Sequence, residues 1–122
     1  MYNPLIHKRP YGAAYVGGAI DIKFPLDCCL QIKRVFIVLR HVFGEGGAVD
    51  GGSLRFELPY RNTENGEDIF EGALSLLDYG IYKYRFEGEY QDGSLAFFGR
   101  GGDGGAVLGD WLPEWQLTVS KC

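Results

Sequence analysis

Apolar and polar residues alternate along several short stretches of the chain, as in strands that bury one face and expose the other. In 19–24, Ile20, Ile22 and Phe24 share one side, while Asp21 and Lys23 share the other. The same alternation predicts strands over 53–61, 81–90, 95–100 and 114–120, and a weaker one over 69–77.

The most apolar run of the chain, 31–42, does not alternate. Its centre, residues 35–39, reads Val-Phe-Ile-Val-Leu. A continuous run rich in β-branched residues predicts a central strand covered on both faces. A buried helix is the alternative, and the β-branched content disfavours it.

Turn-forming residues separate these stretches. We predict turns over 25–28 and 62–68, and a hairpin turn over 91–94, where Asp-Gly accommodates positive φ. Pro59 lacks a ladder donor, so the strand around it should be an edge strand or should end there.

The number and spacing of the strands predict an all-β fold, an immunoglobulin-like antiparallel β-sandwich of about seven strands in one domain, 1–122. Two apolar faces should lie in its core: Tyr82, Tyr84 and Phe86, and Trp115, Leu117 and Val119. Tyr82 also stands where a Greek-key sandwich carries its tyrosine corner.

Composition and charge exclude several classes of function. The net charge is −4 and the basic residues are scattered, which disfavours nucleic-acid binding. No apolar run approaches the length of a membrane span, and residues 1–10 do not look like a signal peptide.

The cysteines indicate a reducing compartment. Cys28, Cys29 and Cys122 are an odd number with an adjacent pair, which makes a poor disulfide framework. We expect free thiols and a cytoplasmic protein, with a vicinal disulfide as the rarer alternative. Without Cys-x-x-Cys spacing we expect no zinc site.

Nothing in the sequence indicates catalysis. The histidines are His7, in a terminal segment, and His41, at the end of the apolar run. No Gly-x-Ser-x-Gly motif is present, so no catalytic residue, cofactor or metal is expected.

The last third of the chain holds the candidate binding residues. Two glycine-rich segments, 44–52 and 101–110, are predicted connections without regular structure, and the second lacks the Gly-Lys-Ser/Thr ending of a phosphate loop. Trp111 follows the second and could be a binding platform, a docking residue or simply buried. Phe98 has the opposite parity to Phe97, so one of the two should face outward.

Four segments together resemble a known family: Pro-Tyr-Gly-Ala-Ala at 10–14, Gly-Ile-Tyr-Lys-Tyr-Arg-Phe at 80–86, Phe-Gly-Arg-Gly-Gly-Asp-Gly-Gly at 98–105 and Trp-Gln-Leu-Thr-Val at 115–119. Their order and spacing are similar, over nearly the whole chain, to the N-terminal domain of bacterial α-amylase-family glycoside hydrolases of the neopullulanase, cyclomaltodextrinase and amylopullulanase type. In that family a catalytic (β/α)₈ barrel follows shortly after the last segment and holds the catalytic carboxylates.

The resemblance implies a non-catalytic accessory domain of an enzyme that hydrolyses α-glucans such as starch, pullulan or maltodextrin. Weak carbohydrate binding through surface aromatics is one expected role. The expected partners are the enzyme's own catalytic domain and α-glucan oligosaccharides, with no nucleic acid or membrane. The candidate carbohydrate-binding or docking residues are Tyr11, Phe98, Arg100 and Trp111.

The alternative is a purely structural domain that docks on the barrel or mediates a homodimer of the full-length protein. A third interpretation, an unrelated immunoglobulin-like adhesion module, is disfavoured by the lack of a signal sequence and of a disulfide pattern.

Overall fold

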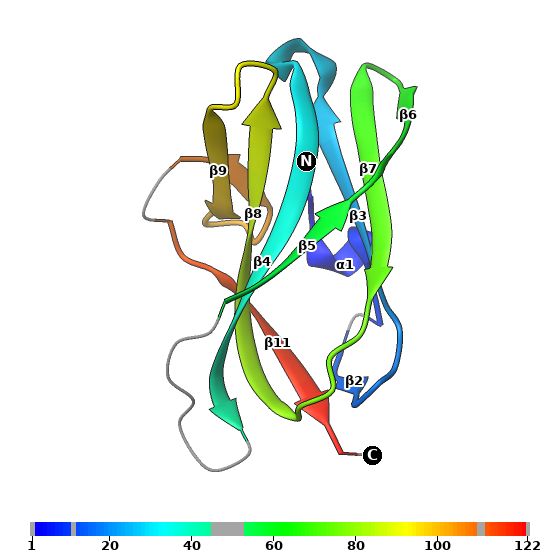
Figure 1. The fold of residues 1–122 in the computed structure, drawn as a ribbon, viewed down its shortest axis with the longest axis vertical. Helices are drawn as coiled ribbons and strands as arrows, with labels where there is room; N and C mark the ends of the chain where they lie inside the picture. The colour runs from blue at the N-terminus through cyan, green and yellow to red at the C-terminus, as the bar shows by residue number, and fades with distance from the viewer. Residues whose placement is uncertain (1, 11, 45–52, 110–111, 122) are drawn as a thin grey trace.

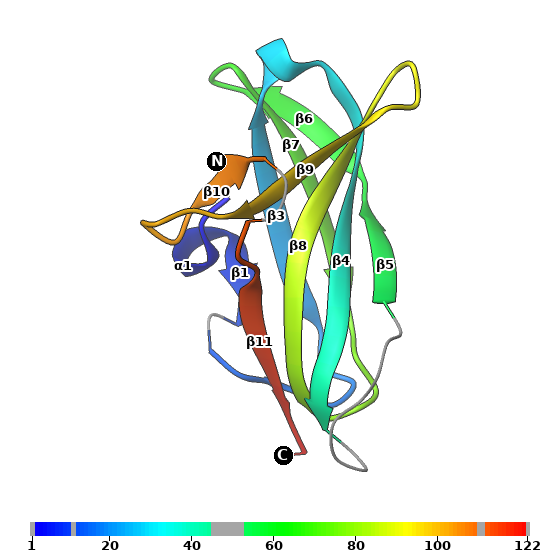
Figure 2. The ribbon, with the colours of Figure 1, turned by 90° about the vertical axis from the view of Figure 1, so that its left-hand side faces the viewer.

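The structure is a computed structural model that describes residues 2–10, 12–44, 53–109 and 112–121. Two packed β-sheets form a sandwich (Figures 1 and 2). The first sheet has the order β1 (Lys8–Arg9), β3 (Ile20–Asp27), β7 (Glu67–Leu74), β6 (Tyr60–Glu64). The second sheet contains β5 (Ser53–Leu58), β4 (Ile32–Gly44), β8 (Gly80–Tyr90), β9 (Leu95–Arg100), β10 (Ala106–Leu108), β11 (Trp115–Ser120) and β2 (Ala14–Tyr15).

The strand order confirms the predicted fold class. The sequence β1-β3-β7-β6 is the A-B-E-D sheet of an immunoglobulin-like sandwich, and β5-β4-β8-β11 is its C′-C-F-G sheet. A single helical turn, α1 (Pro4–His7), precedes β1. Among the described residues no helix is long and apolar enough to cross a membrane.

The core contains the two apolar faces that were predicted from the sequence. Tyr82, Tyr84 and Phe86 of β8 are at most 1 % exposed, and Trp115 of β11 stacks on Tyr84 with ring centroids 5.6 Å apart. From the first sheet, Phe24 stacks on Phe86 at 4.1 Å. The two predicted apolar faces therefore meet between the sheets.

The tyrosine corner is also confirmed. The chain crosses from β7 in one sheet to β8 in the other, and there the Tyr82 hydroxyl donates a 2.7 Å hydrogen bond to the Asp78 carbonyl oxygen. His41 stacks on the Tyr82 ring at 4.2 Å, and its Nε2 lies 3.0 Å from the Tyr79 carbonyl oxygen. The corner is thus fixed by a ring contact as well as by hydrogen bonds.

Strand β4 is central and covered on both faces, as predicted. Its odd-numbered residues from Val35 to Leu39 face the core, while Phe36 and Val38 are 5 % and 4 % exposed on the outer face. Two guanidinium groups cover the Phe36 ring: those of Arg34 at 4.9 Å and Arg55 at 3.6 Å from its centroid. Arginine stems and planar heads can cover apolar surface while remaining hydrated.

Two predicted boundaries are wrong. Residues 25–28 are not a turn, because β3 continues to Asp27 and Pro25 pairs with Ile69 of β7. Strand β1 pairs with β3 only at Asp21 and Ile22, so this pairing ends before Pro25. Pro25 therefore has β7 as a partner on one side of β3 and no partner residue in β1 on the other, which is a position that tolerates proline. The second boundary is β6, which begins immediately after Pro59 and extends to Glu64 in the predicted polar turn.

The glycine-rich segment 101–110 is more regular than predicted. The Gly101 N–H donates to the Gly105 carbonyl oxygen at 2.7 Å, which closes a tight loop and returns the chain to pair as β10 with β9. Strand β5 ends before Pro59, where the chain passes to the first sheet, as the proline predicted. The connection predicted over 44–52 lies, from residue 45 on, outside the described residues.

Candidate functional site

The second sheet forks along one edge of β8. Residues 80–84 of β8 pair with β11, and residues 86–89 pair with β9. Both partners are antiparallel to β8, so β9 and β11 run in line along the same edge. Arg85 lies between the two pairings, and the chain departs from this edge after Arg100 and returns to it at Trp115 (Figure 2).

A cleft of about 370 Å³ opens at this fork. Its wall is made by β8, β9 and the segment that returns to β11, through the residues Arg85, Phe97, Phe98, Gly99, Gly109, Leu112 and Glu114. The close approach of the returning segment depends on Gly99, because a Cβ there would collide with the Leu112 Cβ and lie 2.9 Å from the Pro113 carbonyl oxygen. The Arg100 N–H donates to that same carbonyl oxygen at 2.7 Å.

Glu114 is the acidic group of the cleft, and its side chain is 15 % exposed. Its Oε1 accepts a hydrogen bond from Arg40 Nη2 at 2.6 Å, and its Oε2 lies 3.6 Å from Arg85 Nη1. Among the described residues Oε2 is buried without a hydrogen-bond partner. Buried carboxylate oxygens normally accept hydrogen bonds, so Oε2 has capacity for a donor that enters the cleft.

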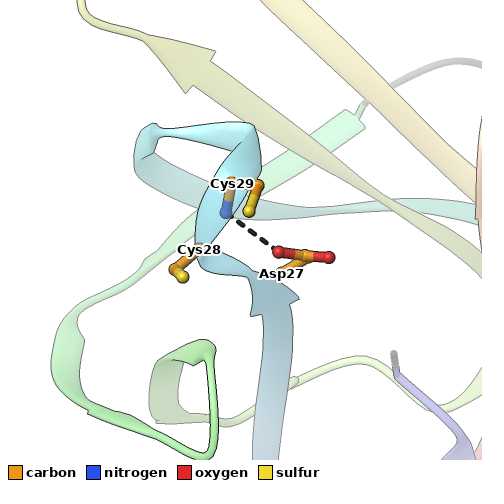
Figure 3. Close-up of side chains that lie close together, drawn as sticks. All are labelled: Asp27, Cys28 and Cys29. Atoms are coloured by element: carbon orange, nitrogen blue, oxygen red, sulfur yellow. Dashed lines mark hydrogen bonds between the residues drawn. The ribbon is translucent and has the colours of Figure 1, made fainter.

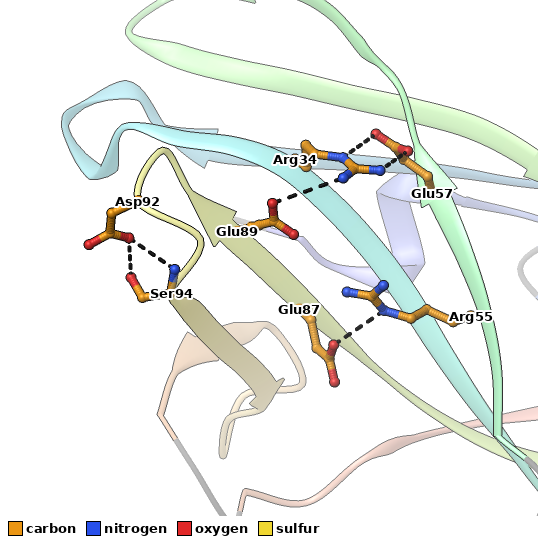
Figure 4. Close-up of polar contacts among 7 residues, drawn as sticks. All are labelled: Arg34, Arg55, Glu57, Glu87, Glu89, Asp92 and Ser94. Atoms are coloured by element: carbon orange, nitrogen blue, oxygen red, sulfur yellow. Dashed lines mark hydrogen bonds and ion pairs between the residues drawn. The ribbon is translucent and has the colours of Figure 1, made fainter.

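Arg85 is held in place from the other side. Its Nη2 donates to Glu87 Oε2 at 3.2 Å, and Glu87 also receives Arg55 at 3.5 Å. These contacts belong to a network across the outer face of the sheet, in which Arg34 pairs with Glu57 at 2.8 Å (Figure 4). The guanidinium at the cleft is therefore orientated by Glu87, two residues further along the same strand, β8.

The apolar surface of the cleft comes mainly from Phe97 and Leu112, both of which are half-buried. Phe97 pairs in register with Glu87 and so lies on the outer face of the sheet. An aromatic ring beside one cation and one carboxylate combines apolar and hydrogen-bonding surface within one concavity.

The structure separates the residues predicted from sequence. Phe98 is 1 % exposed and packs against Phe24 at 5.4 Å, so its ring is in the core and offers no free face, and the outward residue of this pair is Phe97. Arg100 is exposed, donates from Nε to the Glu114 carbonyl oxygen at 3.4 Å, and lines a different cleft beside Trp115. Tyr11 and Trp111 lie outside the described residues.

Sequence reasoning missed Arg85, Phe97, Leu112 and Glu114. The parity of 95–100 was the one available signal, because it required either Phe97 or Phe98 to face outward. Arg85 and Glu114 meet only through the pairing of β8 with β11, and no spacing along the chain indicates that contact.

Comparison of the chain with known protein families finds no match, and comparison with curated proteins finds no match either.

Proposed function

We propose that this domain is a non-catalytic accessory module of an α-glucan-hydrolysing enzyme and that it binds α-glucan weakly in the fork cleft. The observation that carries the proposal is the cleft's lining: the half-exposed Phe97 ring stands beside the Arg85 guanidinium and the Glu114 carboxylate. The C–H face of a pyranose ring packs against an aromatic ring, and its hydroxyls can donate to a carboxylate and accept from a guanidinium.

The substrate class comes from the sequence resemblance. In the family that the chain resembles, the catalytic carboxylates lie in the barrel, so this domain's contribution to the enzyme would be binding or positioning. One of the resembling segments, 98–105, supplies Phe98 and Gly99 to the cleft wall.

Affinity electrophoresis of the 122-residue chain in gels containing amylopectin or pullulan tests the proposal. We expect retardation by the polysaccharide, reduced in Phe97→Ala and in Glu114→Gln. Tyr15→Ala is the matched control, because Tyr15 is 59 % exposed and is not among the residues that line the cleft. Unchanged mobility of the wild-type chain, or an equal loss in Tyr15→Ala, would overturn binding at this cleft.

A second candidate function, docking on the catalytic barrel of the same enzyme, is favoured by apolar side chains around the end of β11. Tyr15, Val16 and Leu77 are 59 %, 39 % and 78 % exposed. The Val16 N–H donates to the Ser120 carbonyl oxygen at 3.0 Å, which places Tyr15 and Val16 beside the end of β11. Leu77 follows Leu76, whose carbonyl oxygen accepts from Gly17 N–H at 2.9 Å.

The docking role is tested in the longer enzyme. Leu77→Ser should lower the thermal stability of the enzyme while leaving that of the isolated domain unchanged, because Leu77 is 78 % exposed in this domain and only a docked barrel would cover it. Leu95→Ser, at 44 % exposure on β9, is the control. Equal melting temperatures of wild-type and Leu77→Ser enzymes would count against docking, and sedimentation of the enzyme with and without residues 1–122 would show a role in dimerisation instead.

A further inference from the structure

The turn between β3 and β4 carries the adjacent cysteines. Cys28–Leu30 form one 3₁₀ turn at the same end of the sandwich as the β8–β9 hairpin (Figures 1 and 2). Asp27 caps the turn, because its Oδ1 accepts from the Cys29 N–H at 2.9 Å (Figure 3). Gln31 closes it in the left-handed region, at φ 55°, and donates to the Cys28 carbonyl oxygen at 3.2 Å.

This turn gathers three metal-ligating side chains. A carboxylate oxygen of Asp27 and the Sγ atoms of Cys28 and Cys29 all lie within 4.8 Å of one another, and all three residues are exposed. Adjacent residues in an extended strand point to opposite faces, whereas adjacent residues in a 3₁₀ helix differ by only about 120°. The 3₁₀ conformation therefore brings the two thiols together without Cys-x-x-Cys spacing.

The distances suit one tetrahedral ion. Metal–sulfur bonds of about 2.3 Å in a tetrahedron place two thiolates about 3.8 Å apart. The sulfur atoms need to approach by no more than about 1 Å, which exposed side chains achieve by small χ rotations. The Cys28 N–H donates to the Gly66 carbonyl oxygen at 3.0 Å, which helps to fix the backbone of the turn.

We propose that Asp27, Cys28 and Cys29 bind one thiophilic divalent cation of the Zn²⁺ and Cd²⁺ class. Binding releases the two thiol protons to solvent and leaves two thiolates and one carboxylate around the ion. Three protein ligands leave a fourth position for water, as in open zinc sites.

Titration of the reduced chain with Cd²⁺ tests the site through the near-ultraviolet absorbance of thiolate-to-metal charge transfer. We expect saturation at one Cd²⁺ per chain. Cys28→Ser and Cys29→Ser should each lower the apparent affinity about 100-fold, because even outer groups around a metal contribute 10–100-fold. Cys122→Ser is the control thiol and should bind as the wild type does.

Asp27→Asn separates ligation from turn stability. Asparagine caps as well as aspartate, so the turn remains intact while the carboxylate charge is lost, and we expect about tenfold weaker binding. Wild-type affinity in Cys28→Ser or Cys29→Ser would overturn the proposal. So would loss of binding in Cys122→Ser, or saturation at one Cd²⁺ per two chains, which would show a bridge between molecules.

Discussion

The hydroxyl groups of Tyr2 and Tyr84 lie 2.7 Å apart and share a hydrogen bond inside the sandwich. Tyr2 is completely buried, with its ring 4.7 Å from that of Phe86 and 5.1 Å from that of Trp115. Its carbonyl oxygen accepts from the Ala106 N–H at 2.8 Å, which ties it to β10. Burial raises the pKa of both phenols, so both stay neutral and either can donate. The N-terminal segment is therefore part of the core.

Truncation of Tyr2 should be among the most damaging substitutions in the chain. Tyr2→Ala removes a buried ring and should lower the free energy of unfolding by about 3–5 kcal/mol. Tyr2→Phe keeps the ring but leaves the Tyr84 hydroxyl unpaired, with an expected loss of about 1–3 kcal/mol. Urea denaturation measures both. A Tyr2→Ala loss no larger than that of the exposed Tyr15→Ala would contradict the packing.

Patterns within one strand were predictable because period-2 alternation reports which face is buried. Ile20 and Phe24 on β3, and Tyr82 and Phe86 on β8, were placed correctly for that reason. Tyr2 was not, because its hydrogen-bond partner Tyr84 is 82 residues away and the segment around Tyr2 has no periodicity. The position of an N-terminal segment over a core depends on the assembled sheets.

The same limit applies to the cleft. Parity restricted the outward aromatic to Phe97 or Phe98, but choosing between them requires the register of β9 on β8, which pairs Phe98 with Phe86. Glu114 belongs to the cleft because β11 follows β9 along one edge of β8, a property of the sheet. The strands could therefore be predicted from the local sequence, whereas the cleft could not, because it depends on how the strands pair.

The tyrosine corner should contribute measurably to stability. Tyr82→Phe removes the donor to the Asp78 carbonyl oxygen and retains the buried ring, so we expect a loss of about 1–2 kcal/mol in the free energy of unfolding. Guanidinium denaturation compares it with Tyr60→Phe, in which the lost hydroxyl partner is the exposed Thr63. Equal losses in the two variants would show that the corner has no special role.

Gly99 should tolerate no side chain. In Gly99→Ala the new methyl group meets the Leu112 Cβ and the Pro113 carbonyl oxygen, so the returning segment must shift, at a cost of about 1–3 kcal/mol. Gly102→Ala is the matched control, because nothing lies within 4 Å of a Cβ there. Thermal unfolding of both variants tests this, and a Gly99→Ala melting temperature equal to that of Gly102→Ala would contradict it.

Stability should fall as the pH decreases through the range of His7. The His7 Nδ1 accepts the Asn3 N–H at 3.0 Å, and burial, followed by the positive N-terminus and Lys23, lowers its pKa below 6.5. Between the lowered pKa of His7 in the folded chain and its ordinary value of about 6.5, the unfolded chain binds more protons than the folded chain. The contribution of His7 to the free energy of unfolding is therefore fully present above this pH range and is lost as the pH falls through it. His7→Ala should flatten this part of the curve of unfolding free energy against pH, and an unchanged slope would be the contrary result.

Glu114 should matter more to stability than an exposed glutamate with the same chemistry. Its carboxylate lies between Arg40 at 2.6 Å and Arg85 at 3.6 Å, and its side chain is 15 % exposed. Glu114→Gln removes the charge that both guanidinium groups face, and we expect a loss of about 1–3 kcal/mol in the free energy of unfolding. Glu57→Gln is the matched control: Glu57 pairs with Arg34 at 2.8 Å but is 43 % exposed, so solvent screens that pair and the loss should be clearly smaller.

Urea denaturation at low and high salt distinguishes the two variants, because added salt should weaken the Glu57 pair and leave most of the Glu114 effect. If the two losses were equal and equally sensitive to salt, the cleft carboxylate would be an ordinary surface charge, and its proposed part in binding a sugar hydroxyl would lose its structural basis.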